Sequence, residues 1–129
     1  KKWHEKEMAD QSWLDDVPDC PDKICPCDSE NWSDPTDADQ NLHLGASKCI
    51  RSKGKGSGQQ CCYDSDGDLI KNNKGAGTPD KTSPSSPWGV IGHYINDVDI
   101  YSFAKHCGDE GINMYLEARP PSQGGGSCD

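Results

Sequence analysis

The amino-acid sequence predicts a small, disulfide-rich α+β domain: a short antiparallel sheet with two flanking helices and long loops. Only 16 of the 129 residues are Leu, Ile, Val or Phe, and the formal net charge is −9. That composition by itself is typical of disordered chains, because it offers too little apolar surface for burial. The eight cysteines reverse the expectation, since disulfides stabilise small domains whose core is insufficient. The adjacent pair Cys61-Cys62, in a segment that leads to the turn dipeptide Asp66-Gly67, predicts the central strand.

All eight cysteines are expected to form four disulfides within the chain. An even number of cysteines in a short polar chain is typical of a disulfide framework. A zinc site is disfavoured, because no two cysteines have the two-residue spacer of zinc motifs. The predicted disulfide cysteines are Cys20, Cys25, Cys27, Cys49, Cys61, Cys62, Cys107 and Cys128. Disulfides persist in oxidising surroundings, so the sequence predicts a secreted protein or the ectodomain of a cell-surface protein.

The central strand is expected to belong to a small sheet built on residues 49–51 and 59–70. Asp66-Gly67 is a strong turn dipeptide between two β-rich segments, which predicts a hairpin. Successive side chains on a strand point to opposite faces, so Cys61 and Cys62 are expected to bond to different, distant partners. Their strand would then be fastened to two parts of the molecule.

Two helices are predicted beside this sheet, at about residues 3–16 and 93–106. The first lies in Lys1–Val17, a run without Gly or Pro that Pro18 ends, and the second ends near Gly108. Gly111–Arg119 fits either a short helix or a strand. We expect polar surface connections over residues 28–47 and 71–87. The domain division is an N-terminal helix, 1–18, that leads into or packs on a disulfide-rich domain, 19–129.

No catalytic centre, cofactor site or metal site is predicted. The four histidines do not combine with a nucleophile and an orienting partner, so we expect a protein that is not an enzyme. The acidic run Asp64–Asp68 resembles the start of a calcium loop. However, an EF-hand beginning at Asp64 would have Leu69 where its glycine belongs, so a hairpin turn is the favoured interpretation. The Asp-rich stretch before residue 40 is interpreted as a solvated loop.

One cluster of basic residues is a candidate partner-binding surface. It could contact a sulfated glycan or an acidic protein, although a mobile loop that needs solubility explains it as well. The cluster consists of Lys48, Arg51, Lys53 and Lys55. Asn31-Trp32-Ser33 is an N-glycosylation sequon, which makes Asn31 a candidate modification site.

The charge and hydropathy of the chain exclude two classes of partner. An acidic chain lacks the basic face that nucleic acids require. No stretch approaches the roughly 20 apolar residues of a transmembrane helix.

Because the sequence begins with Lys1 rather than Met, we expect a processed product or an excised fragment.

Several motifs of the chain together carry a resemblance to a known family. The most specific is Gly58-Gln59-Gln60-Cys61-Cys62-Tyr63, which follows Cys49-Ile50-Arg51-Ser52 and precedes Asp66-Gly67. The other matching motifs are Cys25-Pro26-Cys27, Thr78-Pro79-Asp80, Trp88-Gly89, Tyr115, Arg119-Pro120 and Cys128. With these motifs the chain resembles the AMOP domain, an adhesion-associated extracellular module of membrane mucins, sushi-domain surface proteins and isthmins. The resemblance spans about residues 19–128 and leaves the disulfide pairing open.

The resemblance implies a non-catalytic module for cell adhesion or for contact with a matrix or cell-surface protein or glycan. AMOP domains usually stand beside other domains, so the chain is expected to be part of a larger mosaic protein. Two alternatives stay open: a free-standing secreted ligand such as a signalling factor or toxin, and an acidic protein associated with Ca²⁺ or mineral.

Overall fold

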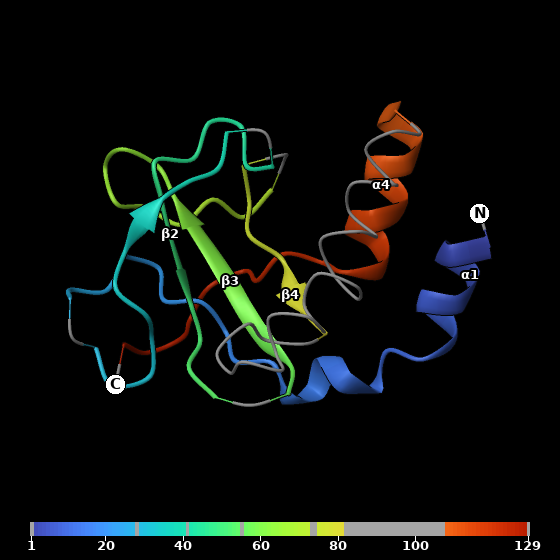
Figure 1. Ribbon diagram of the computed structural model, residues 1–129, viewed down its shortest axis with the longest axis horizontal. Coiled ribbons are helices and arrows are strands. Elements are labelled where there is room, and N and C mark those ends of the chain that lie inside the picture. Colours follow the sequence, from blue (N-terminus) through green and yellow to red (C-terminus); the bar gives the residue numbers. More distant parts are fainter. Residues whose placement is uncertain are drawn as a thin grey trace.

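The computed structural model describes residues 2–27, 29–40, 42–54, 56–72, 75–81 and 108–128 (Figure 1). Within these ranges the chain forms a four-stranded antiparallel sheet and two α-helices, which confirms the predicted class. The strands are β1 (Thr36–Asp37), β2 (Lys48–Arg51), β3 (Gly58–Tyr63) and β4 (Pro79–Asp80). The helices are α1 (Lys2–Ala9), the 3-10 helix η1 (Ser12–Asp16) and α4 (Gly108–Ala118).

The central strand β3 is buried along its whole length, and the strand order is β1-β2-β3-β4. Its two faces contribute to two separate apolar clusters, as alternation on a strand requires. Cys61 and Tyr63 lie in one cluster with Trp32 and Ile50. Cys62 lies in the other cluster, with Cys49 and Ala46.

The three disulfides found in the described residues confirm that Cys61 and Cys62 have different partners. Cys61 bonds to Cys20, and Cys25 bonds to Cys128. The partner of Cys62 is not distant, because it is Cys49, which faces Cys62 across the β2–β3 pair. These bridges tie the segment after η1, the sheet and the C-terminal tail together.

The prediction of four disulfides is wrong for the residues that the structure describes. Cys27 is an exposed free thiol, and Cys107 lies outside the described residues. The buried Cys25 takes the bond to the C-terminal tail, and beyond Pro26 the chain turns with Cys27 toward solvent. Every other cysteine in the described part is already bonded.

The turn predicted at Asp66-Gly67 is present. The amide of Gly67 donates to the carbonyl of Asp64 at 3.0 Å, and Gly67 adopts the left-handed φ of 80° that such turns need. The regular strand ends at Tyr63, and the chain returns through an antiparallel bridge between Tyr63 and Leu69. The predicted strand over 59–70 is therefore a strand, a turn and a short return.

The single helix predicted over Lys1–Val17 is wrong, because the chain breaks between α1 and η1. The carboxylate of Asp10 accepts hydrogen bonds from both the amide and the hydroxyl of Ser12. Such local side-chain bonds compete with the helical hydrogen-bond pattern. Gln11 uses its side-chain amide to reach the carbonyl of Ala118 at 2.9 Å.

Both segments predicted as polar surface connections, residues 28–47 and 71–87, contribute residues to the core. Trp32 is 2% exposed and donates from its indole nitrogen to the carbonyl of Ser127 at 2.8 Å. Residues 75–80 are buried, and their last two form β4. A Cβ at Gly77 would lie 2.2 Å from the carbonyl oxygen of Gln60, so only glycine permits this close approach.

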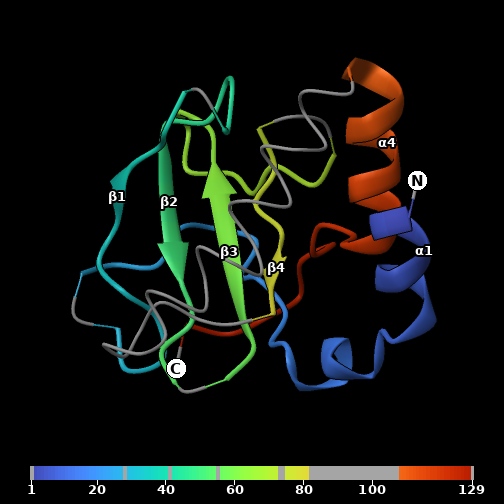
Figure 2. The ribbon, with the colours of Figure 1, turned by 45° about the vertical axis from the view of Figure 1, so that its right-hand side comes forward.

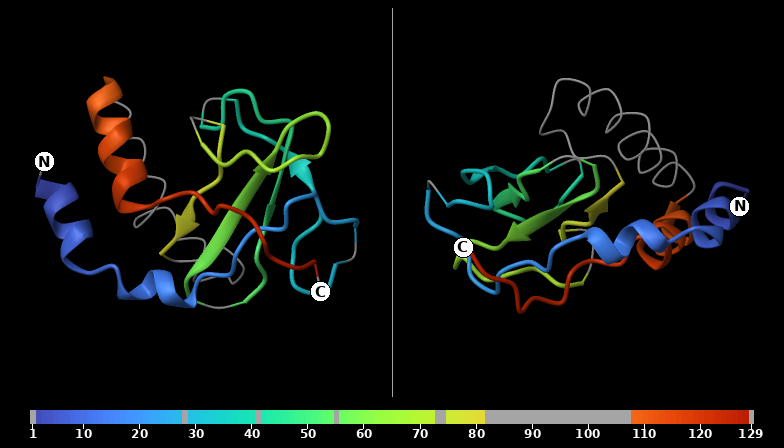
Figure 3. Two further views of the ribbon diagram at one scale, coloured as in Figure 1. Left: turned by 180° about the vertical axis from the view of Figure 1, so that it is seen from behind. Right: turned by 90° about the horizontal axis from the view of Figure 1, so that it is seen from below.

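The segment 108–118 is helical, which settles the alternative between a helix and a strand in this part of the chain. Helices α4 and α1 lie side by side beyond the β4 edge of the sheet (Figures 2 and 3). The hydroxyl of Tyr115 lies 3.3 Å from that of Thr78, which connects α4 to the start of β4. The helix predicted at 93–106 lies outside the described residues.

The fully buried Arg119 joins the two helices. Its guanidinium donates to both carboxylate oxygens of Glu7, at 3.0 and 3.4 Å. The same group lies 5.3 Å from the ring centroid of Trp13 and 5.8 Å from that of Tyr115. A buried guanidinium is tolerated when a charge partner and aromatic faces replace its water.

Candidate functional site

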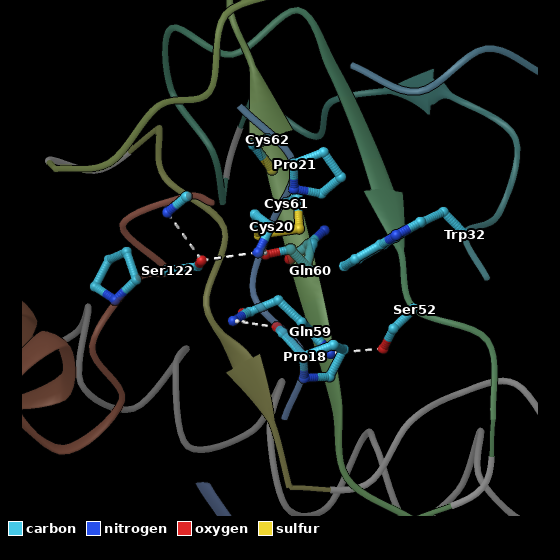
Figure 4. The surroundings of a disulfide bond; sticks show 12 residues. Pro18, Cys20, Pro21, Trp32, Ser52, Gln59, Gln60, Cys61, Cys62 and Ser122 are labelled. Carbon is cyan, nitrogen blue, oxygen red and sulfur yellow. Dashed lines mark hydrogen bonds between the residues drawn. A yellow bond between two sulfur atoms is a disulfide. The ribbon is translucent and has the colours of Figure 1, made fainter. Parts of the chain in front are cut away.

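The most specific motif of the chain, Gly58–Tyr63, forms the buried strand β3 and has a structural role. Figure 4 shows the Cys20–Cys61 disulfide on β3 with the surrounding residues. The amide of Gln59 donates to the hydroxyl of Ser52 at 2.8 Å, and its side chain reaches the carbonyl of Pro18 at 3.4 Å (Figure 4). Because all six residues of β3 are buried, they hold the frame together and offer no surface for a partner.

The two described histidines contact neighbouring segments of the fold. His43 is buried with its Nδ1 atom 3.3 Å from the carbonyl of Ala76, and burial lowers the pKa of its imidazole. His4 lies 3.3 Å from the carboxylate of Glu117. His93 and His106 lie outside the described residues, so the absence of a catalytic centre stays a prediction.

The basic residues predicted to bind a partner are engaged within the fold where the structure describes them. Lys48 pairs with Asp37 at 2.5 Å, and Arg51 pairs with the buried Asp80 at 2.5 Å. The ammonium group of Lys53 donates to the carbonyl of Ser29 at 3.0 Å, and Lys55 lies outside the described residues. Arg51 therefore joins β2 to β4, and the partner-binding role of the cluster stays a prediction.

The sequon at Asn31 lies on an exposed edge next to a buried tryptophan. Asn31 is exposed, whereas the Trp32 side chain lies in the core. The backbone amide of Arg51 donates to the Ser33 hydroxyl at 2.9 Å, and the backbone amide of Lys53 donates to the Asn31 carbonyl at 2.9 Å. Glycosylation of Asn31 remains a prediction that this geometry permits.

The carboxylates of Asp64, Asp66 and Asp68 lie within 4.8 Å of one another. The turn itself accounts for this cluster, because one oxygen of Asp64 accepts the amides of Asp66 and Asp68. Asp68 also forms an ion pair with Lys23, which raises the pKa of that lysine. The hairpin interpretation of the acidic run thus has a physical basis.

A groove of about 840 Å³ lies between α4, the turn at residues 42–46 and the start of the hairpin. We call it the α4 groove; its described lining residues are Leu44, Gly45, Asp64, Ile70, Asp109, Ile112, Asn113 and Leu116. The four helical members have the spacing of one helix face. Tyr115 is not among them; its ring lies next to the guanidinium of Arg119, which follows α4 and also contacts Trp13.

Sequence reasoning missed this groove. Two signals pointed to it: the spacing of Asp109, Ile112 and Leu116 along a helix, and the apolar pair Leu42 and Leu44 within a polar connection. Neither signal says that the two segments, far apart in the chain, meet.

The small sheet and its intramolecular disulfides define the class of the molecule, a disulfide-stabilised extracellular domain. The family profile of the AMOP domain matches residues 1–128, and the chain belongs to this family. It is similar to human Sushi domain-containing protein 2, with 33% identity over 147 aligned positions. The alignment covers 92% of this chain and 17% of that protein.

No solved structure matches the chain. Among the described residues, no helix is long and apolar enough to cross a membrane. The family match begins at residue 1, so it includes α1, which Arg119 joins to α4 through Glu7.

Proposed function

We propose that the chain is a non-catalytic extracellular module that binds a protein or glycan of the cell surface or matrix and supports adhesion. One observation carries this proposal: the family motif Gly58–Tyr63 is wholly buried in a disulfide-bonded frame. Residues that identify the family thus build a scaffold, and recognition is left to the surfaces around it. No cofactor and no nucleic acid is part of the proposal.

An adhesion assay on purified protein tests this function. The folded chain is coated on a surface, and attachment of cells is compared with attachment to the reduced and alkylated chain. We expect attachment to the folded form and its loss after reduction, because the surfaces exist only while the disulfides hold the frame. Equal attachment to both forms, or to neither, would contradict the proposal.

The basic cluster is tested separately in the same assay. A Lys53→Ala/Lys55→Ala variant removes two charges from the loop between β2 and β3 and leaves the Arg51–Asp80 ion pair in place. If this loop contacts the partner, the variant weakens attachment and the effect shrinks at high salt. Unchanged attachment would remove the loop from the binding surface.

We also propose that the chain works within a larger surface protein. This is supported by its relative, which by its name contains a sushi domain as well and of which the alignment covers only 17%. An immunoblot of source material with and without reductant tests this. A band near the 14.0 kDa of the chain would instead indicate a free-standing secreted factor.

Treatment of the same material with peptide N-glycosidase, compared with an Asn31→Gln variant, tests glycosylation.

A further inference from the structure

The N-glycosylation sequon is tied into the fold at all three of its residues. The backbone amide of Lys53 donates to the carbonyl of Asn31 at 2.9 Å, and the backbone amide of Ser33 donates to the carbonyl of Arg51 at 2.8 Å. The hydroxyl of Ser33 accepts the backbone amide of Arg51 at 2.9 Å. Trp32, between Asn31 and Ser33, is 2% exposed. The sequence of 129 residues contains no second sequon, so these contacts concern its single candidate acceptor.

The C-terminal tail holds Trp32 in the core. The indole nitrogen of Trp32 donates to the carbonyl of Ser127 at 2.8 Å, and the next residue, Cys128, is bonded to Cys25. Cys25 and Trp32 belong to the same apolar cluster, and Cys128 packs against that cluster. The side chain of Trp32 can therefore leave the core only when its contact with the tail opens.

The tail docks on the segment that follows η1, and it is made long after the sequon. The amide of Cys20 donates to the hydroxyl of Ser122 at 2.8 Å (Figure 4), and the amide of Gly126 donates to the carbonyl of Cys20 at 3.0 Å. Ser127 follows Trp32 by 95 residues. At the usual synthesis rate of about 5–20 residues per second, the sequon waits roughly 5–20 s for its contact in the tail.

Attachment of a glycan requires a transferase to reach two groups of the sequon together. The Nδ2 atom of Asn31 forms a bond to the anomeric carbon of an oligosaccharide carried on a lipid pyrophosphate. The bond from that carbon to the pyrophosphate oxygen breaks, the pyrophosphate leaves with the electron pair, and Nδ2 loses a proton. The motif demands Ser or Thr because the hydroxyl, here that of Ser33, is recognised as well. Since Trp32 stands between these groups, both can enter the enzyme only when Trp32 has left the core.

We propose that Asn31 accepts a glycan only while the C-terminal tail is undocked, so that closure of the Cys25–Cys128 disulfide ends the period in which transfer is possible. The restriction concerns the transfer and not the product, because Asn31 is exposed and lines a hollow of about 500 Å³ in the folded domain. The glycosylated fraction of the protein then reports which step came first, transfer or docking of the tail. This inference rests on the glycosylation proposed above and is independent of the adhesion role.

The test offers the unglycosylated chain to purified oligosaccharyltransferase with its lipid-linked oligosaccharide, in the folded form and in the reduced and alkylated form. Mass spectrometry of the peptide that contains Asn31 measures the transfer. We expect transfer to the reduced chain to be at least about tenfold faster, because the folded chain must first open a buried segment locally. Ser33→Ala should abolish transfer to the reduced chain, which identifies Asn31 as the acceptor.

Two disulfide variants show whether the tail controls this opening. Cys25→Ala/Cys128→Ala should raise the rate of transfer to the folded chain severalfold, relative to the rate of its own reduced form. Cys49→Ala/Cys62→Ala is the matched control, because it removes a disulfide inside the β2–β3 hairpin and leaves the bond to the tail in place. We expect the control to resist transfer as the unchanged protein does.

Trp32→Phe tests the same contact without removing a disulfide. It deletes the donor to Ser127 and keeps an aromatic ring in the core, so transfer to the folded form should again be faster relative to the reduced form. Thermal unfolding shows whether each variant is folded, and Trp32→Phe decides if Cys25→Ala/Cys128→Ala is not.

Three results would overturn the proposal. Equal rates for the folded and the reduced unchanged chain would show that the fold does not protect the sequon. Equal effects of the two disulfide variants, or no effect of the folded variants at Cys128 and Trp32, would show that the tail does not control access. No transfer even to the reduced chain would contradict glycosylation of Asn31 itself, and the adhesion assay would be unaffected.

Discussion

At the scale of single residues, His43 combines burial with a titratable ring close to neutral pH. It belongs to the turn that carries Leu44, and its ring lies next to the carbonyl of Ala76. Burial is the main cause that lowers the pKa of His43, and the positive charge of Arg51 lowers it further. The folded protein therefore holds this imidazole neutral at a pH at which the unfolded chain takes up a proton.

We predict that the free energy of unfolding falls as the pH drops below about 6.5, the usual pKa of an unfolded histidine. The sign follows from proton counts, because below that pH the unfolded chain binds more protons at this position than the folded one. His43→Gln should flatten this part of the pH dependence, measured by urea unfolding at several pH values. Identical pH profiles for the variant and the unchanged protein would show that His43 is not responsible.

Cys27 is the other residue with a specific consequence, since the structure leaves its thiol free and exposed. We predict that iodoacetamide modifies Cys27 in the native protein without reductant, while Cys25 and the other bonded cysteines stay unmodified. Peptide mass spectrometry under non-reducing conditions measures this. A Cys27 peptide found in disulfide linkage to another peptide would contradict it.

At the scale of elements, α1 depends on its contact with α4, because α1 has no buried residue of its own. Glu7 is the partner of the fully buried Arg119, and the Glu7 side chain is 12% exposed. Glu7→Gln should lower the free energy of unfolding by about 2 kcal/mol, since it removes the charge that compensates a buried guanidinium. Hydrogen exchange should become faster over residues 2–9.

Glu5→Gln is the control for this prediction, because Glu5 is an exposed residue of the same helix. It should change the free energy of unfolding by only a few tenths of a kcal/mol, as is usual for surface substitutions. Similar losses in both variants would mean that the net charge of α1, and not its contact with Arg119, determines how firmly it docks.

At the scale of the whole molecule, the disulfides differ in how much chain they enclose. Cys25–Cys128 spans 103 residues, whereas Cys49–Cys62 spans 13. In the chain-entropy description a longer closed loop restricts the unfolded state more, by about 2 kcal/mol for these two lengths. We predict that Cys25→Ala/Cys128→Ala destabilises the domain more than Cys49→Ala/Cys62→Ala does. Urea unfolding of the two double variants measures the difference, and the reverse order would contradict it.

The sequence predicts those parts of the fold that local chemistry determines. Because side chains alternate between the two faces of a strand, Cys61 and Cys62 were expected on opposite faces, and Asp66-Gly67 specified the turn. Composition and cysteine number together indicated an extracellular domain held by disulfides. Each of these inferences needs only neighbouring residues or the total composition.

Features that depend on contacts between distant segments could not be predicted in this way. Nothing near Trp32 in the sequence says that its indole will find the carbonyl of Ser127. The burial of residues 75–80 depends on the close approach of Gly77 to Gln60 on β3. The α4 groove likewise exists only because Leu44 and Ile112 meet in space.

The short outer strands of the sheet affect how readily an extracellular domain can aggregate or accept an added strand. Within the described residues, β1 and β4 have two residues each, and β4 contains Pro79, which has no amide hydrogen to donate. An incoming extended chain therefore finds almost no backbone ladder to continue, which disfavours both strand addition by a partner and sheet-to-sheet aggregation. An extracellular domain works without chaperones, and these short outer strands disfavour its polymerisation. Recognition through side chains is thereby favoured over recognition by strand addition.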